Sequence, residues 1–178
     1  MRKANAIVVS LMIVALLAHM ILGGLELAGI GGMPMRWLSD SLLLIVGVHI
    51  VLSTILTVKS IIAIKKSGTH YFKENKLFWL RRFSGLLIIV GLVFHLIIFY
   101  SKDNEAYRLE AFNFVYLASQ IILILFIAIH VISNIKPVLI SFGITSLKRF
   151  SVDILFILSI ALLLSLVAFI IYYVRWQV

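Results

Sequence analysis

Histidine is the residue type in this sequence that could carry chemistry. Four of the five histidines lie inside long uncharged stretches, one in each, at His19, His49, His95 and His130. An ionisable side chain is costly in hydrocarbon, so an imidazole placed there usually has a partner or a task. The question that the sequence raises is therefore which of these four side chains can meet.

The composition indicates where these histidines lie. Of the 178 residues, 63% are hydrophobic and 13% are charged, and the mean hydropathy is +1.17, which is far too apolar for a soluble domain of this size. A spanning helix needs about 20 residues. Five uncharged stretches approach or exceed that length: residues 4–25, 41–58, 83–101, 111–135 and 154–174. We therefore expect an all-α integral membrane bundle of five transmembrane helices, forming a single domain over residues 1–178.

Charge predicts how the bundle is oriented. With the N-terminus inside, 12 of the 16 Lys and Arg residues fall on one side and 4 on the other. The positive-inside rule then predicts a cytoplasmic N-terminus and an outer C-terminus. Because topology accounts for the net charge of +9, that charge does not indicate a nucleic-acid partner. The absence of Cys excludes disulfides, thiolate chemistry and a protein-ligated iron–sulfur cluster of the usual kind.

Depth in the bilayer sorts the four histidines into two pairs. His19 and His95 lie past the middle of outward-running stretches, so both fall in the outer half. His130 lies roughly 8 Å from the inner end of an inward-running stretch, at 1.5 Å per residue. Depth alone leaves His49 near the middle, from where it can lean inward to meet His130. We expect an outer pair, His19 with His95, and an inner pair, His49 with His130.

Two histidines at one depth on neighbouring helices can bind one haem iron from both faces, and haem is an apolar cofactor that fits between membrane helices. The plain alternative is that each imidazole hydrogen-bonds a carbonyl or hydroxyl group on the next helix. Four histidines in two layers favour haem over that alternative. A metal-ion transporter normally has Asp or Glu beside its intramembrane histidines, whereas none of the five stretches here contains an acidic residue.

The segment YFKENKLFWLRRFSGLLIIVGLVFH, residues 71–95, carries a family resemblance. It contains Tyr-Phe, then Arg-x-Ser-Gly, then a His ten residues after that Gly; Gly-Ile-Thr follows His130 after thirteen residues. With four His in order and a last helix without one, most of the chain resembles the five-helix, dihaem cytochrome b subunit of succinate:menaquinone oxidoreductases and menaquinol:fumarate reductases. The chain departs from the family at two places. The family often has Gly at the position of Asn134, and the basic segment that the family has before the first helix is reduced here to Arg2 and Lys3.

The resemblance implies two haem b groups, the outer held by His19 and His95 and the inner by His49 and His130. It also implies a flavoprotein subunit and an iron–sulfur subunit on the cytoplasmic face of a bacterial cytoplasmic membrane. Menaquinone would be the substrate, at a site in this subunit near the outer surface. Since the chain has no flavin, dinucleotide or cluster motif, we expect it to anchor the catalytic subunits and carry electrons, not to convert the dicarboxylate.

Five further residues are candidates for the site. Arg81 and Arg82, at the start of the third stretch, could pair with haem propionates, because the guanidinium fork matches carboxylates. Glu26 and Asp40, in the expected first outer loop, and Gln120, in the outer half of the fourth stretch, are candidates for the quinone site. The alternatives are solvated loop charges for the two acids and an interhelical hydrogen bond for Gln120.

Two basic segments, residues 65–82 and 136–149, would form the platform for the partner subunits, or would only set topology and attract anionic lipid. The chain could also anchor a different cytoplasmic reductase through the same scaffold. A third hypothesis is a small haem-free transporter. Inverted repeats and broken helices are typical of transporters, whereas no repeat is visible here and Pro34 and Pro137 are expected in loops.

Overall fold

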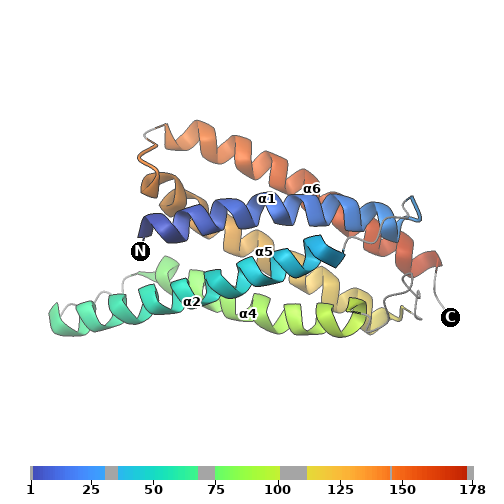
Figure 1. Cartoon of the computed structure of the whole chain (residues 1–178), viewed down its shortest axis with the longest axis horizontal. Helices are drawn as coiled ribbons and strands as arrows, with labels where there is room; N and C mark the ends of the chain where they lie inside the picture. Colours follow the sequence, from blue (N-terminus) through green and yellow to red (C-terminus); the bar gives the residue numbers. More distant parts are fainter. Residues whose placement is uncertain (1, 31–35, 68–74, 101–111, 145, 176–178) are drawn as a thin grey trace.

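The computed structural model describes residues 2–30, 36–67, 75–100, 112–144 and 146–175 (Figure 1). Within these ranges all regular structure is helical: α1 (Arg2–Leu27), α2 (Arg36–Ser67), α4 (Lys76–Phe99), α5 (Phe114–Ser141) and α6 (Leu147–Arg175). Each of these helices is long and apolar enough to cross a membrane. The prediction of an all-α, multi-pass membrane protein with five spans is confirmed.

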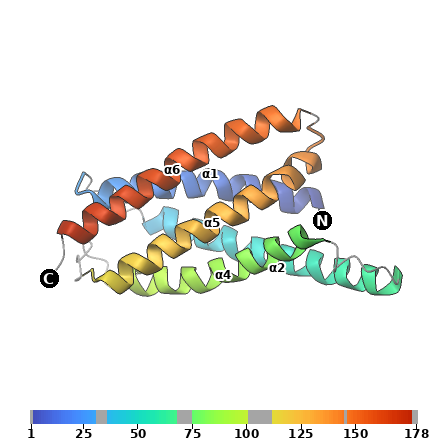
Figure 2. The same ribbon diagram turned by 180° about the vertical axis from the view of Figure 1, so that it is seen from behind.

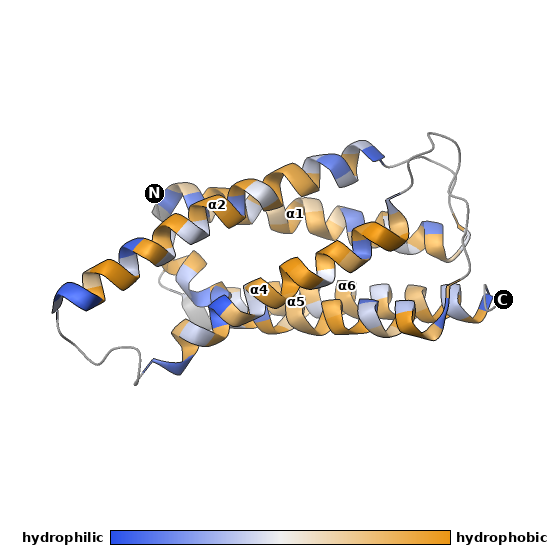
Figure 3. Ribbon diagram, turned by 90° about the horizontal axis from the view of Figure 1, so that it is seen from below, coloured by the Kyte–Doolittle hydropathy of each residue, from blue (hydrophilic) through white to orange (hydrophobic). Residues whose placement is uncertain are grey.

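The helices run alternately in opposite directions, so the N-terminus and the C-terminus lie at opposite ends of the bundle (Figures 1 and 2). Neighbours pack in the order α2, α1, α6, α5, α4, and α1 also touches α5. Hydrophobic residues cover the middles of the helices, and hydrophilic residues gather mostly toward the ends (Figure 3). This distribution is expected of a bundle whose outer surface faces lipid.

Every helix is longer than the uncharged stretch that predicted it, because charged residues at a membrane surface can continue a helix into water. Two of the starts are capped by asparagine. The side chain of Asn75 accepts a hydrogen bond from the backbone N–H of Phe78 at 3.0 Å, and that of Asn113 accepts one from Tyr116 at 3.0 Å. Such caps satisfy backbone donors that have no partner within the helix.

The expectation that Pro137 lies in a loop is wrong, because α5 continues through it to Ser141. Proline has no N–H to donate to the carbonyl four residues earlier, here that of Ser133. A donor on a neighbouring helix takes the place of the missing N–H. Nε of Arg81, on α4, donates a hydrogen bond to the Ser133 carbonyl at 2.7 Å. The helix therefore passes the proline with this carbonyl satisfied. Pro34 lies outside the described residues.

The Gly-Ile-Thr element of the family resemblance has a structural role at the end of α5. Gly143 has a φ of 75°, which other residues rarely adopt. Its N–H donates to Ile140 O at 3.0 Å, and the N–H of Ile144 donates to Leu139 O at 3.2 Å. These two bonds form a Schellman motif, which satisfies the last carbonyls of the helix.

Candidate functional site

The four intramembrane histidines lie in two groups of two, and these are the pairs that depth predicts. The ring centroids of His19, on α1, and His95, on α4, are 6.1 Å apart, and the ring planes make an angle of 75°. The centroids of His49, on α2, and His130, on α5, are 6.4 Å apart, with an angle of 80°. In each pair, one imidazole comes from the α1 and α2 side of the bundle and the other from the α4 and α5 side.

These separations can be compared with those of a shared metal. A metal–nitrogen bond of about 2.0 Å, with the ring centre about 1.15 Å behind the nitrogen, places two opposed ring centres about 6.3 Å apart. A direct N–H···N hydrogen bond of about 2.9 Å would place them at about 5.2 Å. Both observed centroid distances are closer to the first value than to the second.

In the outer pair, the second nitrogen of each ring lies near a polar side chain of another helix. Nδ1 of His95 is 2.7 Å from Oε1 of Gln120, on α5, and Nδ1 of His19 is 3.4 Å from Oγ of Ser39, on α2. Metal-binding histidines almost always use their second nitrogen in this way, because the bond fixes the tautomer and the ring orientation.

The inner pair is held by two serines. Nδ1 of His130 is 3.0 Å from Oγ of Ser84, a buried residue of α4. A Cβ on the next residue, Gly85, would lie 3.2 Å from Cε1 of His130, so glycine lets α4 approach this ring closely. Both ring nitrogens of His49 are 3.4 Å from Oγ of Ser53, one turn later on α2.

The two pairs support each other through the same helices. Three helices each carry a histidine of one pair and, ten or eleven residues away, the polar partner of a histidine in the other pair: Ser39 and His49 on α2, Ser84 and His95 on α4, and Gln120 and His130 on α5. At 1.5 Å per residue, the two layers lie about 15 Å apart along the helix axes. The rotation and height of each helix therefore affect both pairs at once.

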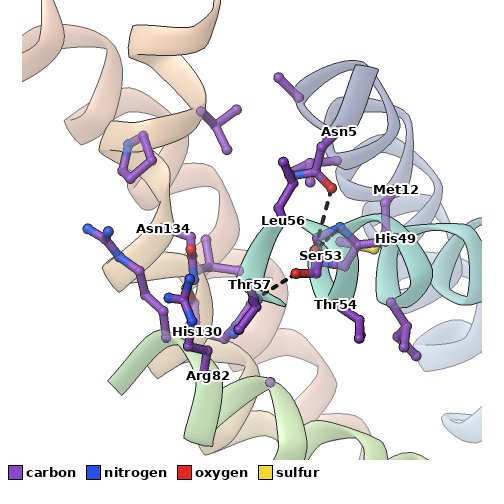
Figure 4. A pocket seen from close by; sticks show the side chains of 18 of the residues that line it. Asn5, Met12, His49, Ser53, Thr54, Leu56, Thr57, Arg82, His130 and Asn134 are labelled. Atoms are coloured by element: carbon purple, nitrogen blue, oxygen red, sulfur yellow. Dashed lines mark hydrogen bonds between the residues drawn. The ribbon is translucent and has the colours of Figure 1, made fainter. Parts of the chain in front are cut away.

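A cavity of about 540 Å³ separates α1 and α2 from α4 and α5 at the level of the inner pair. Figure 4 shows His49 on one wall of this cavity and His130, Arg82 and Asn134 on the other. Apolar side chains such as Met12 complete the lining. Its size is within the range of about 300–1,000 Å³ that is typical of cofactor pockets.

Arg81 and Arg82 both line this cavity, so the structure brings them to the inner pair. Each is also bound to a backbone carbonyl, Arg81 to Ser133 and Arg82 through Nη1 to Phe78 at 2.9 Å. The Arg82 guanidinium carbon lies 3.3 Å from the centroid of the Phe78 ring. These contacts place two cationic groups on the wall that carries His130.

Two of the three quinone-site candidates, Glu26 and Asp40, were expected in an outer loop but lie in helices. Glu26 is in the last turn of α1 and Asp40 is near the start of α2, so placing them in a loop was wrong. Asp40 is exposed, and its Oδ2 is 3.8 Å from Nε of Arg36. Gln120 is fully buried and bonded to His95. For Gln120, the alternative of an interhelical hydrogen bond is confirmed.

The sequence reasoning missed Ser39, Ser53 and Ser84, which lie next to three of the four histidines. Ser84 belongs to the Arg-x-Ser-Gly element, and Ser53 follows His49 by four residues, so both had a local signal. Ser39 had none, because its approach to His19 depends on how α1 and α2 pack. Of the predicted docking segments, residues 68–74 and residue 145 lie outside the part of the chain that the structure describes.

Within the described residues, no group of three or more His, Asp or Glu side chains could hold a metal ion. Each histidine pair brings two imidazoles together. Comparisons with protein-family models, curated proteins and solved structures gave no match to this chain. The geometry of the two histidine pairs therefore carries the functional argument.

Proposed function

We propose that this chain is a dihaem cytochrome b subunit. It would anchor the catalytic subunits of a succinate dehydrogenase or fumarate reductase and carry electrons between their iron–sulfur clusters and menaquinone. The observation that carries the proposal is the spacing of the two histidine pairs, with ring centroids 6.1 Å and 6.4 Å apart and nearby polar partners for the ring nitrogens.

Each layer would supply two imidazoles to one haem. His19 and His95 would hold the outer haem b, and His49 and His130 the inner one. The inner pair lines the cavity of about 540 Å³, whose wall is largely apolar, as the macrocycle requires. Arg81 and Arg82 would pair with the propionates of the inner haem, since guanidinium groups match carboxylates.

Each bound haem would supply a one-electron carrier. The chain itself would hold two such carriers in layers about 15 Å apart along the helix axes, given ten residues at 1.5 Å each. Gln120 and the serines beside the histidines would orient the imidazoles, and the surrounding helices would exclude water. No residue of this chain would need to take part in dicarboxylate chemistry.

The proposed location is the bacterial cytoplasmic membrane, with the N-terminus in the cytoplasm and the C-terminus outside. One end of the bundle carries exposed basic residues on four helices: Lys65, Lys66, Lys76, Lys136 and Arg149. This end would face the cytoplasm and dock the iron–sulfur and flavoprotein subunits. The same charges would also attract anionic lipid, at about 1 kcal/mol for each cation.

Menaquinone would bind near the outer pair. Asp40 follows Ser39, whose hydroxyl lies 3.4 Å from His19, so it is the acid with a link to that layer. Glu26, in the last turn of α1, is the second candidate for proton exchange. Gln120 is better explained as the partner of His95 than as a contact of the quinone, because it is fully buried.

The proposal is tested by the number of haems that the purified chain binds. After expression with sufficient haem, we expect about two low-spin b haems per chain, as two bis-imidazole sites require. Ala in place of any one of the four intramembrane histidines should either abolish the binding of one haem or convert that haem to high spin. His70→Ala, at the histidine outside the apolar stretches, is the control and should leave both. One haem or none in the unaltered chain would overturn the proposal, and co-purifying subunits would identify the reductase.

A further inference from the structure

Gln120 is a polar side chain that the surrounding helices enclose completely. It lies on α5 with none of its surface exposed. Its Oε1 is 2.7 Å from Nδ1 of His95, on α4, and its Nε2 is 3.0 Å from Oγ of Ser119. Both ends of the amide are therefore engaged, and the orientation of the amide can be worked out from its neighbours.

The direction of these hydrogen bonds follows from the contact between Ser119 and the backbone carbonyl of Tyr116. Oγ of Ser119 is 2.7 Å from the backbone carbonyl of Tyr116, and a carbonyl can only accept, so the hydroxyl proton points there. The Ser119 oxygen then accepts from the amide nitrogen of Gln120. The amide oxygen of Gln120 must consequently face His95.

This orientation fixes the tautomer of His95. An amide oxygen carries no proton, so the imidazole must donate through Nδ1–H. A neutral imidazole has one such proton, which leaves Nε2 with the lone pair that a metal requires. The contacts from Tyr116 to Gln120 thus select the ligating form of His95 from within the protein.

The inner layer has a comparable but weaker arrangement. Oγ of Ser84 is 3.2 Å from the carbonyl of Arg81 and 3.0 Å from Nδ1 of His130, so its proton can point to either atom, and these contacts do not select one tautomer of His130. The bond from His95 to Gln120 is shorter, at 2.7 Å, and its acceptor is an amide oxygen. The outer layer therefore has the stronger acceptor on its α4 imidazole.

We propose that Gln120 is a positioning residue that holds His95 with Nε2 as its ligating nitrogen and lowers the midpoint potential of the outer haem. This inference rests on the proposed function. Donation of Nδ1–H to a strong acceptor raises the basicity of the ligating nitrogen. A more basic ligand favours the more highly charged ferric iron, and hydrogen bonding to axial ligands is one of the ways in which proteins set haem potentials.

The test is a redox titration of the purified full-length protein, in which the optical spectrum reports the oxidation state of each haem. Gln120→Leu removes the acceptor, and the potential of one haem should rise while that of the other stays unchanged. Gln120→Glu keeps an acceptor oxygen at the same place in either protonation state, so the potential should remain at or below the original value. Ser84→Ala should shift only the other haem. Ser159→Ala, at an exposed serine of α6, should shift neither.

A second readout does not depend on haem. In protein labelled with ¹⁵N-histidine and prepared without haem, His95 should show the Nδ1–H tautomer, and Gln120→Leu should lose this preference. An Nε2–H tautomer at His95 would overturn the inference. So would an unchanged potential in Gln120→Leu with both haems bound, or equal effects of Leu and Glu, which would show that Gln120 only fills space.

The two proposals can fail separately. If the unaltered chain binds no haem, the proposed function is wrong and the statement about potential falls with it. The tautomer measurement would then decide the positioning role alone. If two haems bind and Gln120→Leu changes neither potential nor tautomer, the proposed function stands and the role of Gln120 is wrong.

Discussion

At the scale of single residues, the second nitrogen of each imidazole distinguishes this site from a set of scattered histidines. Nδ1 of His95 and Nδ1 of His130 lie 2.7 Å and 3.0 Å from polar atoms of a neighbouring helix. Nδ1 of His19 is 3.4 Å from a hydroxyl of a neighbouring helix, and both ring nitrogens of His49 are 3.4 Å from a hydroxyl of its own helix. The imidazoles of α4 and α5 are therefore held more firmly than those of α1 and α2.

The first prediction concerns Ser84, which we expect to hold the ring of His130. Ser84→Ala removes the hydroxyl group that contacts Nδ1 of His130, and changes of such supporting partners typically lower metal affinity by about 10- to 100-fold. The rate of haem transfer from the purified protein to apomyoglobin should therefore increase for one of the two haems. Ser165→Ala is the control, because its hydroxyl donates to the Ala161 carbonyl on its own helix. Unchanged transfer from Ser84→Ala would contradict the role assigned to it.

At the scale of the helices, α4 and α5 form a unit that depends on more than apolar packing. Pro137 deprives the Ser133 carbonyl of its helical partner, and Arg81 supplies a replacement at 2.7 Å from the other helix. On the same two helices, Gly91 permits close approach, since a Cβ there would lie 2.9 Å from Cδ1 of Leu123. Glycines that permit close approach and polar contacts between side chains of α4 and groups of α5 thus both contribute to the packing of these two helices.

The second prediction is that Arg81 and Pro137 are energetically coupled. Arg81→Met leaves the Ser133 carbonyl without a donor, which should cost about 1–3 kcal/mol of unfolding free energy. Pro137→Ala restores an N–H at the position that donates to this carbonyl. The cost of Arg81→Met should therefore be smaller in the Pro137→Ala background, as measured by a double-mutant cycle of unfolding in detergent.

Additive effects would show that the Ser133 carbonyl does not need Arg81. The measurement is best made without haem, so that the proposed contact of Arg81 with a propionate does not contribute. Lys76→Met, at an exposed cation one and a half turns earlier on α4, is the matched control. Its effect on stability should be the same with Pro or Ala at position 137.

At the scale of the whole molecule, the bundle has two ends and two histidine layers, and the proposed electron path joins them. Most of the exposed basic residues of α2, α4, α5 and α6 gather at one end, near the inner pair, whereas Arg36 and Arg175 lie at the other end. The outer pair lies about 15 Å further along the helices, at 1.5 Å per residue. Function therefore depends on which end faces the cytoplasm.

The third prediction tests this orientation. Because the chain has no native cysteine, a single introduced thiol can be labelled without background. Lys66→Cys, at an exposed site at the end of α2, should react with a membrane-impermeant maleimide only after the cells are opened. Phe114→Cys, exposed at the start of α5, should react in intact cells. The reverse labelling pattern would place the N-terminus outside.

The fourth prediction assigns the two layers to the two electron-transfer partners. His95→Ala should abolish turnover with quinol while leaving reduction from the cytoplasmic subunits intact, because His49 and His130 form a separate layer. His130→Ala should block reduction from the cytoplasmic side and leave reduction by added quinol. Difference spectra after addition of each reductant measure both effects. The opposite pattern would show that the layers are assigned the wrong way round.

The sequence by itself determined the five spans and the grouping of the histidines. Both depend on distances along the chain: an apolar stretch of about 20 residues must cross the membrane, and position along a straight helix gives depth at 1.5 Å per residue. His19 and His95 could therefore be paired from numbering and topology alone. The helix ends were less predictable, since charged residues such as Lys65 continue a helix beyond the apolar stretch.

Only the tertiary structure decided which polar side chains meet the histidines. Whether Ser39 or Gln120 reaches an imidazole depends on the rotation of each helix about its axis, and packing sets that rotation. The same holds for Pro137, which local sequence rules place in a loop. A donor from a distant part of the chain, Arg81, makes a helical proline tolerable there. Depth follows from the sequence, whereas the direction in which a side chain points follows from its neighbours.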